Sequence, residues 1–107
     1  MPENREPAYL YLTTTGRCTG EPREIELWFT RRDGRYYVIA EFAHSQWVRN
    51  LQADPRVLVR LEDGPVRATA RMLDPASEPE LNSAVQQLSR EKYGWGEGIV
   101  VELTPET

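Results

Sequence analysis

The stretch EIELWFTRRDGRYYVIAE, residues 24–41, decides the fold class of this sequence. Its centre, Asp33-Gly34, predicts a tight hairpin turn, because glycine adopts the positive φ of such turns without a Cβ clash. RYYVIAE then returns as the antiparallel partner of the segment before the turn. That first segment alternates with period two, which predicts a half-buried strand: Ile25, Leu27 and Phe29 point one way, and Glu24, Glu26, Trp28 and Thr30 the other.

On the N-terminal side of this hairpin, AYLYLTT (residues 8–14) is rich in aromatic and β-branched side chains and predicts another strand. TGRCTGEPR (residues 15–23) follows and, with two glycines and a proline, predicts a loop. Residues 1–7, MPENREP, are polar and hold two prolines, so we expect a flexible leader there.

On the C-terminal side the period changes. Trp47, Val48 and Leu51 have helical spacing, with Ser45 as a plausible N-cap and Pro55 after the end. A second hairpin, a second helix and a closing strand follow in residues 56–73, 75–95 and 98–104, and helix-start chemistry occurs at Ser77 or Ser83.

These elements have the order βββαββαβ. Short strands joined by tight turns around a shared apolar face predict a mainly β (α+β) domain, namely a six-stranded antiparallel barrel with two short helices over its openings. We expect residues 8–107 to form this single domain.

Composition excludes several classes of function. The net charge of −4 disfavours a general nucleic-acid binder. A single cysteine, Cys18, and a single histidine, His44, give no intrachain disulfide and no zinc-ligand pattern, so we expect no metal. No apolar stretch reaches the length of a membrane span or resembles a signal peptide, which predicts a cytoplasmic protein.

The loop at residues 16–23 has the chemistry of an anion site. Gly16 and Gly20 let the backbone approach a ligand, and loop N–H groups can surround an anion. Arg17 and Arg23 add permanent charge in a fork geometry suited to phosphate or carboxylate. The competing interpretation is a plain hairpin loop whose arginines pair with nearby acids, Glu21 and Glu24.

Two motifs together resemble a known family. LTTTGRCTGEPR (residues 12–23), followed at the right separation by WVRNLQADPRV (residues 47–57), is similar to the deazaflavin-dependent nitroreductase and quinone reductase family, which uses coenzyme F420. The resemblance runs in register from about residue 9 to the C-terminal VVELTP. It implies a six-stranded split β-barrel related to barrels that bind flavin mononucleotide (FMN). It also implies hydride transfer from reduced F420 to a conjugated acceptor such as a quinone or a nitroaromatic.

The resemblance also places a site. It implies that the phosphate and acidic tail of F420 contact the loop and that the deazaflavin ring lies near the end of the hairpin and the first helix. Candidate acceptor-binding residues lie near the C-terminus. The implied cofactor residues are Thr14, Gly16, Arg17, Cys18, Thr19, Arg23, Ala40, Glu41, Trp47 and Asn50, and the implied acceptor residues are Tyr93 and Trp95.

Two positions depart from the family pattern: Cys18 replaces a usual lysine, and Glu26 replaces a common proline. Several alternatives therefore stay open. Trp47 can anchor its helix instead of flanking a ring, and Tyr93 and Trp95 can plug a barrel end. The proton donor can be solvent, Tyr93 or His44. The chain can instead bind FMN or heme, or act as a non-catalytic small-molecule-binding homodimer.

Overall fold

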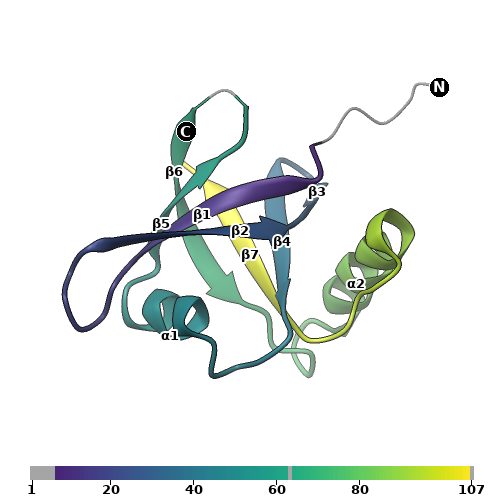
Figure 1. Ribbon diagram of the computed structural model, residues 1–107. Coiled ribbons are helices and arrows are strands. Elements are labelled where there is room, and N and C mark those ends of the chain that lie inside the picture. The colour runs from purple at the N-terminus through teal and green to yellow at the C-terminus, as the bar shows by residue number, and fades with distance from the viewer. Residues whose placement is uncertain (1–6, 63, 107) are drawn as a thin grey trace.

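The computed structural model describes residues 7–62 and 64–106, which form seven strands and two helices (Figure 1). The predicted leader at residues 1–7 lies outside the described residues except for Pro7. The strands are β1 (Tyr9–Thr15), β2 (Pro22–Trp28), β3 (Thr30–Arg32), β4 (Arg35–Ala40), β5 (Arg56–Arg60), β6 (Pro65–Met72) and β7 (Ile99–Pro105), and the helices are α1 (Gln46–Ala53) and α2 (Pro79–Tyr93).

The strands form one antiparallel sheet in the order β2-β1-β5-β6-β7-β4-β3. Its two edge strands, β2 and β3, are consecutive in the chain and meet at Phe29. The sheet therefore curls into a half-barrel that the covalent chain closes at Phe29 and that stays open between β2 and β4. In Figure 1 the β1–β2 arm crosses in front of β4 and β7. The prediction of a mainly β split barrel with two short helices is confirmed.

The segment expected as one strand over residues 24–31 is divided at Phe29, which raises the strand number from the predicted six to seven among the described residues. Phe29 leaves the β ladder because the chain must turn there from one sheet edge to the other. Its ring is 1% exposed in the core, as the alternation predicts.

The prediction that this segment is half-buried is wrong for β2. Ile25, on the face toward the barrel interior, is 37% exposed, because β2 borders the open side of the barrel. Thr30, expected to point to solvent, is 5% exposed because α2 covers the outer face of the sheet beside it.

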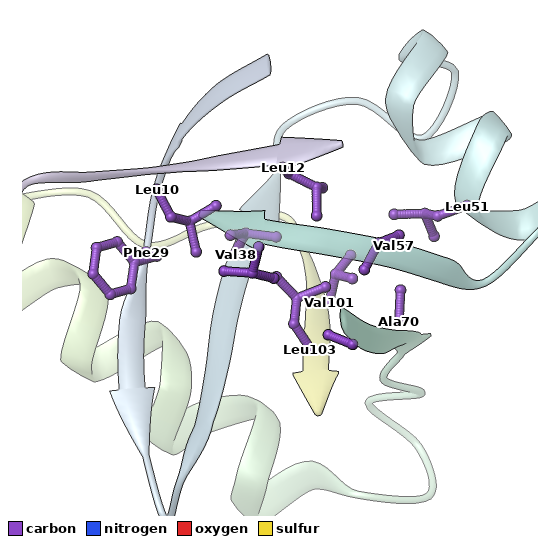
Figure 2. Packing of buried hydrophobic residues seen from close by; sticks show 11 residues of the cluster. Leu10, Leu12, Phe29, Val38, Leu51, Val57, Ala70, Val101 and Leu103 are labelled. Carbon is purple, nitrogen blue, oxygen red and sulfur yellow. The ribbon is translucent and has the colours of Figure 1, made fainter. Parts of the chain in front are cut away.

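The main core fills the concave side of the sheet. Alternate residues of β1 are buried there, and Leu51 of α1 points toward Val57 from the opposite side (Figure 2). Residues directly opposite each other on neighbouring strands lie on the same face of the sheet, so the alternation of buried and exposed residues in β1 continues in the other strands. The buried cluster consists of Leu10, Leu12, Phe29, Val38, Leu51, Val57, Val59, Ala68, Ala70, Val101 and Leu103.

A smaller cluster joins α2 to the outer face of β4 and β7, where Val85 packs with Tyr37 and Val100. Helix α2 begins at Pro79, not at Ser77 or Ser83, because proline suits the first turn of a helix. Helix α1 follows its predicted start, with Ser45 at the N-cap position, although the Ser45 side chain forms no capping hydrogen bond in the described structure.

The C-terminal end of α2 fixes the bend at Phe29. The Phe29 N–H donates to the Tyr93 hydroxyl oxygen at 3.0 Å, and this hydroxyl lies 2.6 Å from the Ala8 carbonyl oxygen, to which it donates. Lys92 Nζ donates to the carbonyl oxygens of Pro7 and Phe29, each at 3.0 Å, and lies 4.0 Å from the centre of the Phe29 ring. The bend thus depends on contacts far away in sequence.

We predict that Tyr93→Phe lowers the free energy of unfolding by about 1–2 kcal/mol, because it removes the hydroxyl that pairs with the Phe29 backbone while keeping the ring. Urea unfolding followed by tryptophan fluorescence measures the change. Tyr11→Phe is the matched control, since its hydroxyl bonds to Glu26 on the exposed surface, and we expect a loss below about 0.5 kcal/mol. Equal stability of the Tyr93 variant and the unaltered protein would contradict this account.

Candidate functional site

A groove follows the open side of the half-barrel along β2. Among the described residues it consists of two adjoining cavities that share Ser45 and Trp47. We call the first, of about 790 Å³, the loop cavity; its lining is Thr14, Gly16, Arg17, Cys18, Thr19, Arg23, Glu24, Ile25, Ser45, Gln46, Trp47 and Asn50. We call the second, of about 610 Å³, the aromatic cavity; its lining is Tyr9, Glu26, Leu27, Trp28, Phe29, Thr30, Tyr37, Ile39, Ala40, Glu41, Phe42, Ser45, Trp47, Ser89 and Trp95.

The structure brings the predicted site residues together in this groove. The loop cavity takes the loop residues, Thr14 and Asn50; the aromatic cavity takes Ala40, Glu41 and Trp95, and Trp47 belongs to both. Tyr93 is not part of either lining among the described residues. It lies behind Trp28, with the two rings stacked 4.5 Å apart at 5°.

Internal hydrogen bonds shape the loop between β1 and β2. The Gly16 N–H donates to the Glu21 carbonyl at 2.8 Å, the Gly20 N–H to the Gly16 carbonyl at 2.7 Å, and the Glu21 N–H to Thr19 Oγ1 at 3.2 Å. A Cβ on Gly16 would lie 3.0 Å from Thr19 Oγ1 and 3.1 Å from the Glu21 carbonyl oxygen, so a side chain at this position would push against the loop. The sequence predicts that several loop N–H groups are available to an anion. In the structure only those of Cys18 and Thr19 have no hydrogen-bond partner within the described part of the chain.

Asn50, which is 5% exposed, ties the loop to α1. Its Oδ1 accepts from the Arg17 backbone N–H at 3.2 Å and from Arg17 Nη1 at 2.8 Å, and its Nδ2 donates to Thr14 Oγ1 at 3.2 Å. These bonds occupy most of its amide. Asn50 therefore orients the guanidinium of Arg17 without neutralising its charge.

The arginines of the loop do not pair with Glu21 or Glu24 in the described residues. Arg17 bonds to a neutral amide, and Glu24 pairs instead with Arg60 at 3.3 Å. Arg23 forms no ion pair with any residue in 7–62 or 64–106. The loop cavity thus holds two guanidinium groups that have no carboxylate partner in the described part of the chain, which favours the anion-site interpretation over the plain hairpin loop.

The free edge of β2 forms one wall of the groove. Because Gly16 and Glu21 are a hydrogen-bonded pair, the alternation of antiparallel ladders makes the pairs of Glu24, Glu26 and Trp28 non-hydrogen-bonded. The N–H and C=O groups of these three residues therefore point away from β1 toward the open side. They offer donors and acceptors to a ligand with an amide-like edge.

Aromatic side chains dominate the second cavity. Trp28 is 43% exposed and lies 6.5 Å from Trp95 in an edge-to-face arrangement, and Phe42 is 52% exposed. The sequence interpretation missed Trp28, Phe42 and Ser45. A tryptophan beside the end of an edge strand was the available signal for Trp28, but strand periodicity assigned it to a solvent-facing side.

Polar groups lie among these rings. Tyr37 is 2% exposed and donates to Glu102 Oε2 at 2.9 Å, and Glu102 also accepts from Arg71 Nη2 at 3.1 Å. Burial raises the pKa of Tyr37, and its hydrogen bond to Glu102 raises this pKa further, so the phenol stays protonated. Thr30 Oγ1 has no hydrogen-bond partner among the described residues.

The candidate groups for nucleophilic or proton chemistry lie at the surface. Cys18 is an exposed thiol, and the exposed His44 ring is 5.5 Å from Phe42 and outside both linings. Within residues 7–62 and 64–106, no three His, Cys, Asp or Glu side chains group as metal ligands. No helix there has the length and apolarity to cross a membrane.

The sequence matches the model of the F420H2-dependent quinone reductase family over residues 3–98. The chain belongs to this family. Its cofactor is coenzyme F420, as the family's dependence on F420H2 implies. The contacts described above fit such a group, since two guanidinium groups that form no ion pair with the described residues lie at one end of the groove and flat rings at the other.

Solved structures agree with the fold of the family. The F420-H2-dependent reductase FDR-A is 26% identical, with a TM-score of 0.73 over 92% of this chain and 94% of that one. The heme storage protein HutZ from Vibrio cholerae is 21% identical, with a TM-score of 0.75 over 94% and 82%. A structure described as a domain-swapped dimer is 24% identical, with a TM-score of 0.73 over 94% and 81%.

We predict that Asn50→Ala lowers the free energy of unfolding by about 2 kcal/mol, because it leaves Thr14 Oγ1 and the Arg17 N–H without their partner. Amide exchange at Arg17 should accelerate as the loop loosens. Arg49→Ala, an exposed position on the same helix, is the matched control for both measurements. Unchanged exchange at Arg17 in the Asn50 variant would show that the loop is held by other contacts.

Proposed function

We propose that this chain is an F420H2-dependent oxidoreductase that transfers a hydride to a conjugated acceptor such as a quinone or a nitroaromatic. The observation that carries the proposal is the groove itself. It joins a loop with two guanidinium groups that form no ion pair with the described residues to an aromatic cavity, which suits a planar coenzyme with an anionic tail.

The residues of the loop cavity would hold the tail. Arg17 and Arg23 supply charge, and Thr14, Gly16, Cys18 and Thr19 shape the surface around them. Cys18 replaces a cation usual in the family, so the two arginines provide the charge of this loop. Asn50 acts through Arg17, whose guanidinium it orients.

The ring would lie near Ala40, Glu41 and Trp47, and the acceptor near Trp28 and Trp95. Tyr93 would act on the acceptor through Trp28, against which it stacks. Reduced F420 supplies the hydride, and a proton completes the reduction of the acceptor. The protein positions the two partners and excludes water with its aromatic side chains, and this requires no side-chain nucleophile.

We predict that calorimetric titration with F420 gives micromolar binding and that Arg23→Ala weakens it about tenfold or more, because charged hydrogen bonds to anions are lost. Arg17→Ala should weaken it as well. Arg67→Ala, an exposed arginine on β6 outside the groove, is the matched control. Equal affinity for F420 in all variants would show that the coenzyme does not bind at this loop. If the protein bound FMN or heme but not F420, the proposed function would be wrong and the chain would be a flavin- or heme-binding protein.

We also propose that two copies of the chain associate through the outer face of β1 and β5. Tyr9 and Leu58 are exposed there by 44% and 37%, whereas α2 covers the outer face of β4 and β7. Exposed apolar groups that share one sheet face are typical of an interface. The domain-swapped dimer among the similar structures is compatible with pairing of this fold.

We predict that sedimentation equilibrium shows a dimer and that Leu58→Arg converts it into a monomer, because a charge would be placed in the apolar contact. Val66→Arg is the matched control. Val66 lies on the neighbouring strand β6 opposite Val59, so its side chain is on the other face of the sheet from Leu58. A monomeric unaltered protein, or a Leu58 variant that stays dimeric, would contradict this interface.

A further inference from the structure

The charges of the groove are divided between its ends. The loop cavity contains Arg17 and Arg23 together with Glu24. Among the described residues that line the aromatic cavity, the charged side chains are two carboxylates, Glu26 and Glu41, and none is Arg, Lys or His. A ligand that enters the aromatic cavity therefore meets a different electrostatic environment from one in the loop cavity.

Neither carboxylate of the aromatic cavity is neutralised in the described structure. Glu41 is exposed at the end of β4 and forms no ion pair with the residues described. Glu26 accepts a hydrogen bond from the Tyr11 hydroxyl at 2.8 Å, and this bond raises the pKa of Tyr11, so the donor is a neutral phenol. This hydrogen bond is not an ion pair, and Glu26 forms none with the described residues.

Lys92, at the C-terminal end of α2, contacts the bend at Phe29. Lys92 donates to the carbonyl oxygens of Pro7 and Phe29 and contacts the Phe29 and Tyr93 rings. It is not among the described residues that line the aromatic cavity. Arg60 lies 4.2 Å from the centre of the Tyr11 ring, pairs with Glu24 and is likewise outside this lining. Among the described lining residues, the two carboxylates are therefore the charged groups that an acceptor meets.

The exposed ring of Trp28 also favours a cationic ligand over an anionic one. Tyr93 covers one face of this ring, so its exposed surface is on the other face and the edges. The face of an indole carries negative potential and attracts cations over anions. Aromatic surface and carboxylates thus favour the same class of ligand.

We propose that the aromatic cavity selects its acceptor by charge: it takes planar aromatic acceptors that are neutral or cationic and disfavours those that carry a carboxylate or sulfonate. This selection rests on the proposed function, since it concerns the acceptor of the same reaction. Repulsion by two partly solvated carboxylates at the rim is worth roughly a fivefold to tenfold difference in KM between a cationic and an anionic acceptor.

The test uses 1,4-naphthoquinones that carry a hydroxymethyl, a trimethylammonium-methyl or a sulfonate group. Calorimetry measures the binding of each to the protein without reduced coenzyme, and steady-state kinetics measures reduction with F420H2. The variant is Glu26→Gln with Glu41→Gln, which keeps the side-chain shape and removes both charges. Glu62→Gln, an exposed carboxylate outside both linings, is the matched control.

We expect tightest binding and lowest KM for the cationic quinone, weakest for the sulfonate, and a ratio between them that falls at least threefold in the double variant but not in the control. Added salt should reduce the ratio as well. Equal affinities in the unaltered protein, or a ratio that the double variant preserves, would overturn the proposal.

The outcomes separate this inference from the proposed function. Reduction of all three quinones with equal KM would support the reductase and overturn charge selection. Charge-dependent binding without any reduction would support charge selection at this cavity and overturn the proposed function. Absence of both binding and reduction for all three compounds would overturn both.

Discussion

The groove depends on the way the chain turns at Phe29. There the last residue before β3 leaves one edge of the sheet and starts the other, and the Tyr93 hydroxyl and Lys92 of α2 hold its backbone in place. Because covalent continuity joins the two edges only at this point, β2 and β4 stay apart beyond it. The aromatic cavity lies in the space between them, and the loop cavity continues along β2 to α1. The free edge of β2, the aromatic cavity and the loop cavity all follow from this single bend.

The two ends of the groove acquire opposite character from neighbouring segments of the same strand. At its start, β2 carries Arg23 and receives the loop that Asn50 ties to α1. At its end it carries Glu26 and Trp28 and receives α2, whose Tyr93 supports the tryptophan from behind. A coenzyme with an anionic tail and a flat ring therefore has one favoured direction in the groove. In the proposed function, the coenzyme ring and the acceptor meet at the aromatic end of the groove.

Much of this could be predicted from sequence because the signals are local. Period two, the Asp33-Gly34 turn and the helical spacing after Ala43 are properties of adjacent residues, and they gave the fold class and both helices. The motifs around Arg17 and Trp47 placed the groove's residues together. The division of the strand at Phe29 and the burial of Thr30 depend on α2, which lies about fifty positions later in the chain, and the exposure of Ile25 depends on the open side of the barrel. Tertiary packing also produces the hydrogen bond from Arg17 to Asn50 and the stacking of Tyr93 on Trp28. Sequence periodicity carries no information about either contact.

The central claim is that one groove along the free edge of β2 receives the coenzyme with its tail at the loop. Backbone amide NMR spectra recorded during an F420 titration test it most directly. We predict shift changes at the unbonded loop amides of Cys18 and Thr19 and at the edge amides of Glu24, Glu26 and Trp28, with little change on the outer face of β5 and β6. Shift changes confined to that outer face, or to the loop without the β2 edge, would contradict the claim.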